Sequence, residues 1–179
     1  MPMELPKVLI EDTRNQPGKH GNIHAFCNLN GIRIVRTKLV CGDYSLPTDQ
    51  SVCIDTKQDM GEVYNNLVQS HDRFARECDL AKQLGIHLIV LVEDSEVGCL
   101  DDVHKWSNPR YNRYMMLKAG HEAGRWLGTK LPPKPPLDSK RLEQMMKTFA
   151  NHHGMEWQFC RKSETGFRIC EILMGGDVV

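Results

Sequence analysis

Two aspartates and a lysine lie at the ends of two consecutive segments that are expected to form strands. Asp43 precedes a turn at residues 47–50 and Asp55 follows it, 12 residues further along the chain. Antiparallel pairing of the two segments brings both carboxylates together. Side chains alternate along a strand, so Asp55 and Lys57 project from the same face. Two carboxylates and one ammonium group therefore converge on one point.

This set of side chains suits the hydrolysis of phosphodiesters. Paired carboxylates bind Mg²⁺ or Mn²⁺, which prefer hard oxygen ligands. A neighbouring lysine can orient or help deprotonate the attacking water and offset charge on the phosphate. The spacing alone is not specific, because surface strands often place an acid and a lysine two residues apart as a solvated ion pair. Here, however, residues 54–57 close a strongly apolar run, and charges at the end of a buried strand are typical of functional sites.

The surrounding segments predict an α/β fold. The apolar run at residues 8–10 predicts a strand that delivers Asp12 at its end. Residues 86–92 form the most apolar and β-branched run of the chain, which indicates a strand buried on both faces. The remaining expectations are strands at 32–39, 51–57 and 155–160, helices at 20–29 and 165–173, a helix capped at 138–139, and one helix or a broken pair over 59–84. Strands that alternate with helices predict an α/β sandwich.

The length of 179 residues predicts a single domain over residues 1–179. An irregular insertion and a stiff proline-rich spacer are expected inside it at about 95–136. Basic and aromatic side chains are interleaved in this insertion, which could therefore stack on unpaired bases. A small satellite core or a dimer contact is the favoured alternative. The side chains concerned are Trp106, Pro109, Arg110, Tyr111 and Trp126.

The formal net charge is zero, with 23 basic and 23 acidic residues. This balance argues against a protein that coats DNA nonspecifically. The charge is unevenly spread, because residues 93–102 hold five acids and no base while 130–147 carry five bases and two acids. Neutrality therefore limits DNA affinity without excluding DNA.

Several classes of protein are disfavoured by composition. The chain lacks a run of about 18 apolar residues, so no membrane span is expected. Its first seven residues lack the pattern of a secretory leader, so a soluble, cytoplasmic protein is expected. Seven scattered cysteines without a Cys-x-x-Cys pair argue against a disulfide framework or a structural zinc site, and most are expected to be buried.

Five segments together resemble, in order and spacing, the XPF-type nuclease domain of the PD-(D/E)xK superfamily. The resemblance is firmest over residues 8–93 and continues more loosely through 156–173. It implies an α/β restriction-endonuclease-like core, in which helices flank a central mixed β-sheet. The compact form is most similar to the stand-alone bacterial and phage members. The five segments are Asp12-Thr13-Arg14, Gly42-Asp43-Tyr44, Asp55-Thr56-Lys57, Arg73-Phe74 and the strand at 88–93.

The resemblance also implies roles for individual residues. Asp43 and Asp55 would bind Mg²⁺ or Mn²⁺, with the backbone carbonyl of Thr56 completing the coordination. Lys57 would be the catalytic lysine, and Asp12 an outer acid of the same site that is a further candidate ligand. The residues nominated to bind DNA are Arg14, Lys19, His20 and Arg73. For Lys19 and His20, the alternative of ordinary solvated side chains is equally well supported.

The chain departs from the family pattern at three places. The usual Glu-Arg-Lys reads Asp55-Thr56-Lys57, so the arginine is absent. The acid expected three residues after Asp12 is Asn15, and the acid expected after the lysine is not at its usual offset. Asp59 or Glu62 could supply that last acid. The first two departures remove side chains expected at the catalytic site and so argue for a lower rate of cleavage. They leave the fold prediction unchanged.

The sequence thus predicts a metal-dependent DNA endonuclease that acts on branched or flap DNA, with a role in DNA repair or recombination. Two alternatives stay open: a catalytically degenerate DNA-binding or scaffold protein of the same fold, and another PD-(D/E)xK nuclease of restriction-like or exonuclease type. DNA is the expected partner, and a homodimer is expected from the habit of the family.

Overall fold

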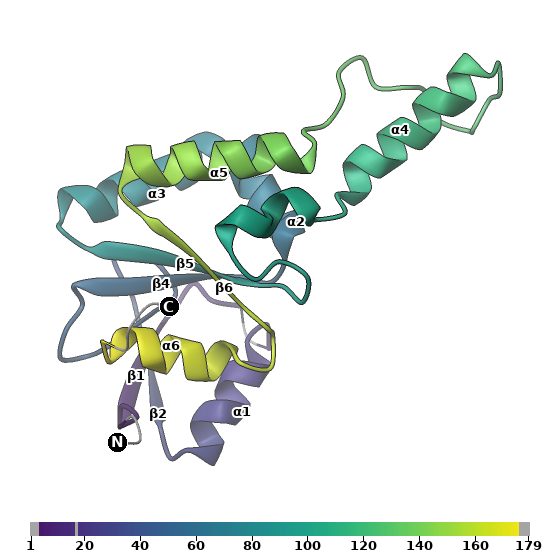
Figure 1. The fold of residues 1–179 in the computed structure, drawn as a ribbon. Coiled ribbons are helices and arrows are strands. Elements are labelled where there is room, and N and C mark those ends of the chain that lie inside the picture. The colour runs from purple at the N-terminus through teal and green to yellow at the C-terminus, as the bar shows by residue number, and fades with distance from the viewer. Residues whose placement is uncertain (1–3, 17, 176–179) are drawn as a thin grey trace.

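The computed structural model describes residues 4–16 and 18–175. Residues 1–3, 17 and 176–179, which the predicted domain of residues 1–179 includes, lie outside this range. A six-stranded sheet in the order β2-β1-β3-β4-β5-β6 forms the centre of the molecule, and helices cover both of its faces (Figure 1). The strands are β1 (Val8–Asp12), β2 (Arg33–Thr37), β3 (Tyr44–Ser45), β4 (Val52–Lys57), β5 (His87–Glu93) and β6 (Glu156–Cys160).

The sheet is mixed. Strand β1 pairs with β2 in parallel, and β4, β5 and β6 also run parallel to one another. The short strand β3 is antiparallel to both β1 and β4 and so joins the two parallel halves. This arrangement confirms the predicted α/β fold with a central mixed sheet.

Two hydrophobic clusters hold the helices to the sheet. One lies under α2 (Met60–Tyr64), α3 (His71–Gln83) and α5 (Ser139–His153), and the other under α1 (Gly21–Leu29) and α6 (Thr165–Leu173). Strand β5 contributes Leu88, Val90 and Val92 to the first cluster and Ile89 and Leu91 to the second. The strand is therefore buried on both faces, as its uniformly apolar sequence predicts.

The helical region at 59–84 is broken, which decides between the two possibilities that the sequence left open. Helix α2 passes into a π-helical turn, η1 (Asn65–Gln69), and α3 begins at His71. Asp59 caps α2 by accepting a hydrogen bond from the backbone N–H of Glu62 at 2.7 Å. The break turns α2 and α3 so that both contribute side chains to one cleft.

The insertion is more regular than the sequence indicated. It contains a 3₁₀ helix, η2 (Leu100–Lys105), and the 14-residue helix α4 (Pro109–Glu122), which projects from the body of the molecule (Figure 1). Asn108 caps α4 by accepting from the backbone N–H of Arg110 at 3.0 Å, and Pro109 occupies its first turn. Only Leu117 and Gly120 of this helix are buried, so its sequence lacks the wide apolar stripe by which a helix is recognised.

Six of the seven cysteines are buried and Cys99 is exposed, which confirms the expectation that most of them pack as small apolar side chains. Within residues 4–16 and 18–175, no helix combines the length and the apolar character needed to cross a bilayer.

Candidate active site

Asp43 is held between the ends of β1 and β4. Its backbone N–H donates to the carbonyl of Ile54 at 2.7 Å, and its own carbonyl accepts from the N–H of Asp12 at 2.8 Å. Gly42, just before it, has φ +69°, and a Cβ atom there would lie 3.0 Å from the Ile54 carbonyl oxygen. Glycine is therefore the residue that fits this close approach. The chain path itself fixes Asp43 beside the end of β4.

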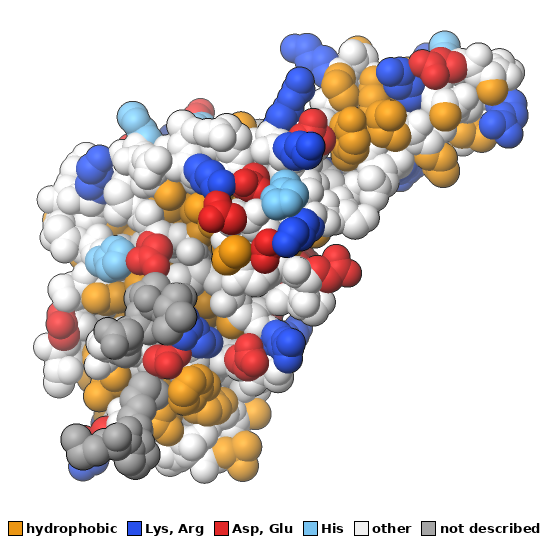
Figure 2. Space-filling view, viewed as in Figure 1, with side chains coloured by type: hydrophobic (Ala, Val, Ile, Leu, Met, Phe, Trp, Pro, Cys, Tyr) orange, Lys and Arg blue, Asp and Glu red, His pale blue; other side chains and the backbone are white. Residues whose placement is uncertain are grey.

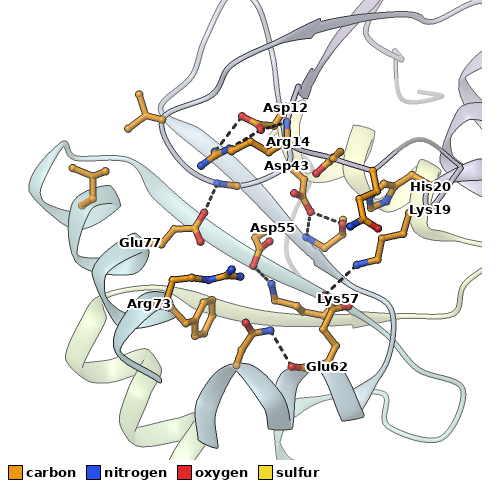
Figure 3. A pocket seen from close by; sticks show the side chains of 18 of the residues that line it. Asp12, Arg14, Lys19, His20, Asp43, Asp55, Lys57, Glu62, Arg73 and Glu77 are labelled. Atoms are coloured by element: carbon orange, nitrogen blue, oxygen red, sulfur yellow. Dashed lines mark hydrogen bonds and ion pairs between the residues drawn. The ribbon is translucent and has the colours of Figure 1, made fainter. Parts of the chain in front are cut away.

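The nine residues nominated from the sequence line one cleft of about 580 Å³ (Figure 3). The walls come from the end of β1, the loops around residues 14–20 and 40–43, the end of β4, and the helices α2 and α3. The structure thus brings together residues that are up to 61 positions apart in the chain, and their individual roles stay predictions. The nine are Asp12, Arg14, Lys19, His20, Asp43, Asp55, Thr56, Lys57 and Arg73.

One oxygen of Asp43 is fixed by Thr56. The backbone N–H and the hydroxyl of Thr56 donate to Oδ2 at 2.8 and 2.6 Å. No described residue donates a hydrogen bond to the other oxygen, Oδ1. Burial and the nearby charge of Asp55 raise the pKa of Asp43 to about 7, against the lowering effect of the Thr56 bonds. A cation bound beside these two acids would relieve this repulsion.

Asp55 and Lys57 form a buried ion pair. The Nζ of Lys57 lies 2.5 Å from Oδ2 of Asp55, and each side chain is 9% exposed. Oδ2 is buried and receives no hydrogen bond from any other described residue. Burial acts to lower the pKa of Lys57, but the charge and proximity of Asp55 outweigh it and the pKa is raised. The ammonium group also lies 5.3 Å from the centroid of the Phe74 ring.

Asp12 is saturated with hydrogen bonds. Its Oδ1 accepts from the backbone N–H and from Nε of Arg14, both at 2.7 Å. Its Oδ2 accepts from Nη2 of Arg14 at 3.1 Å and from the N–H of Leu39 at 2.6 Å. Burial acts to raise the pKa of Asp12, but these hydrogen bonds outweigh it and the pKa is lowered. A carboxylate accepts about four such bonds, so Asp12 in this arrangement organises the rim of the cleft and has no free lone pair for a metal.

The four nominated DNA-binding residues differ in whether their side chains are already paired, buried or exposed in the cleft. Arg14 is held by Asp12, and Nζ of Lys19 lies 3.3 Å from Oε1 of Glu62. His20 is only 6% exposed and packs edge-on against the Tyr44 ring. Arg73 is exposed, makes no ion pair with any described residue, and points toward Asp55 (Figure 3). Of the four, Arg73 is the one best placed to meet a ligand phosphate.

The cleft residues that were not singled out from the sequence include Asn66, Arg76 and Glu77. Oε1 of Glu77 accepts from the backbone N–H of Gly42 at 3.1 Å, which ties α3 to the loop that carries Asp43. The available signal was the spacing, because residues 73, 76 and 77 share one face of a helix. The structure also separates the two candidates for the acid after the lysine: Glu62 lines the cleft, whereas Asp59 caps α2.

The donor atoms at Asp43 and Asp55 fit a hard divalent cation. Oδ1 of Asp43 and Oδ1 of Asp55 receive no hydrogen bond from the described residues, whereas Oδ2 of Asp43 is held by Thr56 and Oδ2 of Asp55 lies against the ammonium group of Lys57. Within residues 4–16 and 18–175, no group of three or more His, Cys, Asp and Glu side chains is arranged to hold a metal. Two carboxylates are the number that Mg²⁺ commonly takes from a protein, because it keeps several waters and binds substrate phosphate.

Comparisons with known proteins give a fold and no family. No family model matches the chain, and no curated protein sequence matches it. The solved structure of XPF from Aeropyrum pernix is similar with a TM-score of 0.58 and 14% identity, over 93% of this chain and 63% of that one. A structure of XPF from Aeropyrum pernix in complex with DNA gives 0.56 and 13%, over 94% and 63%. The chain thus spans less than two thirds of the length of either, and it shares the α/β fold of these XPF structures.

Proposed function

We propose that this protein is a metal-dependent DNA endonuclease that hydrolyses phosphodiester bonds. The observation that carries the proposal is the convergence of the half-buried acid Asp43, the buried acid Asp55 and the buried amine Lys57 in a cleft at the end of β4. One of the similar XPF structures is a complex with DNA, which supports DNA as the substrate class.

In the proposed site, Asp43, Asp55 and the backbone carbonyl of Thr56 hold Mg²⁺ or Mn²⁺. A cation held there would supply Lewis acidity to the phosphate and would lower the pKa of water. Thr56 orients Asp43 by holding Oδ2, which leaves Oδ1 facing away from that clamp. Lys57 keeps its proton beside Asp55 and offers positive charge to the phosphate as negative charge develops on it. Hydrolysis forms one P–O bond to the oxygen of water and breaks another, and the leaving oxygen takes up a proton.

The finer features of the proposal rest on the motif resemblance. Branched or flap DNA is the proposed substrate. The proposed setting is DNA repair or recombination in a bacterium or a phage-infected cell.

The cations free to contact DNA beside the reacting bond are Arg73 and Arg76, both exposed on α3 at the cleft.

A second candidate function is DNA binding without cleavage. It is favoured by the region around Asp12. The guanidinium group of Arg14 donates to both carboxylate oxygens of Asp12, and residue 15 is an asparagine where the XPF-type motif has an acid. The amide nitrogen of Asn15 is buried and donates no hydrogen bond to any residue that the structure describes. This corner of the cleft therefore offers no further acid to a metal, and catalysis would depend on Asp43 and Asp55.

Calorimetric titration with Mg²⁺ and Mn²⁺ and a cleavage assay separate the two candidates. The nuclease proposal predicts that the protein binds one of these ions and cuts a labelled flap or fork internally in its presence. A linear duplex of the same sequence is the matched substrate control, and the sizes of the products separate internal cuts from exonuclease digestion. Binding of DNA with no metal uptake and no cleavage would contradict the nuclease proposal and favour the binding protein.

A further inference from the structure

Residues 109–134, which we call the arm, form an ordered projection from the body. Helix α4, about 21 Å long at 1.5 Å per residue, leads out, and residues 123–134 lead back (Figure 1). The backbone N–H of Arg125 donates to the carbonyl of Gly120 at 2.8 Å. Leu127 packs so closely on Gly120 that a Cβ atom there would lie 2.4 Å from Cδ1 of the leucine. The returning segment therefore folds onto the helix as a built unit.

The arm is strongly basic in a neutral chain. It holds six Lys and Arg residues and one acid, Glu122, whereas the rest of the chain has 17 basic and 22 acidic residues. Figure 2 shows lysine and arginine side chains spread along the arm with hydrophobic side chains between them. Trp126 is 71% exposed there and Met116 60%. Four cations of the arm make neither an ion pair nor a side-chain hydrogen bond with any described residue: Arg113, Arg125, Lys130 and Lys134.

The root of the arm is fixed beside the cleft. Nη2 of Arg110 donates to Oδ1 of Asn65 at 2.7 Å, and its guanidinium lies 4.8 Å from the centroid of the Tyr64 ring. Asn65 precedes Asn66, which lines the cleft. Just beyond the other end of the arm, the backbone N–H of Leu137 donates to the hydroxyl of Tyr64 in α2 at 3.2 Å, and the carbonyl of Leu137 accepts from Nδ2 of Asn108 at 2.8 Å. These contacts anchor both ends of the arm on α2 and η1, the helical region that follows Lys57.

We propose that the arm is a second DNA-binding surface, which holds the phosphate backbone of the same DNA outside the cleft. This inference rests on the proposed function. The cleft itself has nearly balanced charge, because its cations face the acids Asp12, Asp43, Asp55, Glu62 and Glu77. The cleft therefore has little net attraction for DNA, and the unpaired cations of the arm add to the contacts of Arg73 and Arg76. A length of about 21 Å matches roughly six steps of 3.4 Å along a DNA strand.

Charge also decides against a contact between the arms of two copies of this chain. Two arms that each carry an excess of five positive charges would repel each other, and the cores of protein interfaces are depleted of charge. The exposed Trp126 is compatible with DNA, because aromatic side chains stack on unpaired bases.

The test compares two double variants of the full-length chain. Arg125→Gln with Lys130→Gln neutralises two exposed cations of the arm. The control, Lys7→Gln with Arg33→Gln, removes one lysine and one arginine that are exposed at the amino ends of β1 and β2, the opposite end of these strands from Asp12. Fluorescence anisotropy in EDTA measures the affinity for a labelled flap at several salt concentrations, and sedimentation measures the oligomeric state.

We expect the arm variant to bind at least about tenfold more weakly and to reduce the slope of log K against log salt by about 1.8, or 0.9 for each lost phosphate contact. The control keeps the parental slope. If the arm variant binds DNA as the parent does, or if it only changes the oligomeric state, the arm proposal fails while the nuclease proposal stands. If the parent neither binds nor cuts DNA, both proposals fail.

Discussion

Thr56 illustrates how one side chain can set the geometry of the proposed site. In the XPF-type motif that this sequence resembles, an arginine stands at this position. Here the backbone N–H and the hydroxyl of a threonine both donate to the same oxygen of Asp43. Its hydroxyl therefore acts as a positioning group for a proposed metal ligand, because it fixes which oxygen of Asp43 is left free.

Replacement of this hydroxyl gives a direct prediction. Thr56→Val keeps the shape and the backbone donor but removes the 2.6 Å bond. A hydrogen bond to a charged group is worth about 1.5–3 kcal/mol, so we expect cleavage to fall by about tenfold or more and the calorimetric affinity for Mg²⁺ to fall with it. Thr56→Ser, which restores the hydroxyl, should recover both. Equal activity of the valine and serine variants would show that the clamp has no role.

At the scale of residues, the sequence was informative where chemistry and spacing coincide. Asp43, Asp55 and Lys57 could be placed together because two strand ends and the alternation of side chains suffice to locate them. The bonds of Asp12 could not be predicted, because one partner is the backbone of Leu39, 27 residues away. The link between Glu77 and Gly42 was hidden for the same reason, since it depends on how α3 packs against a loop.

At the scale of elements, the loop before β3 is the part on which the site most depends. Gly42 has a positive φ and lies against the backbone of β4, and this contact places Asp43. Strand β3 itself has only two residues, so the loop and its hydrogen bonds do most of the positioning.

Substitution of this glycine tests the positioning, and the chain supplies a matched control. Gly42→Ala adds a Cβ atom 3.0 Å from the Ile54 carbonyl oxygen, whereas Gly31→Ala has nearly the same φ, +67°, and open space around it. Both changes incur the left-handed backbone cost of about 1–2 kcal/mol. We expect the free energy of unfolding measured in urea to fall by more than this backbone cost only in Gly42→Ala. The same variant should also cleave DNA more slowly. Equal effects of the two alanines would mean that the close approach is unimportant.

The elements differed in how well sequence could predict them. Strand β5 was evident because it is apolar at nearly every position, and the break in the 59–84 region left an irregular spacing of apolar residues. Helix α4 was missed because its contacts with the body are confined to a few side chains. Asn108-Pro109 was the usable signal, since a capping residue followed by proline is typical of a helix start.

At the scale of the whole molecule, charge is divided between two regions. The body carries the acids that the proposed metal site requires, and the arm carries unpaired cations. A net charge of zero therefore describes neither region. The sequence indicated an uneven distribution with a basic segment at 130–147, which overlaps the arm only at residues 130–134. It could not show that the arm projects from the same helical region that lines the cleft.

The most direct test of the central claim is Mg²⁺-dependent cleavage of a labelled flap by Asp43→Asn. The control is Asp72→Asn, an exposed acid of α3 that does not line the cleft. Because burial and Asp55 oppose the charge of Asp43, the asparagine variant should melt at or above the parental temperature. We predict that it loses cleavage while Asp72→Asn cuts normally; parental cleavage by a folded Asp43→Asn would contradict the proposed site.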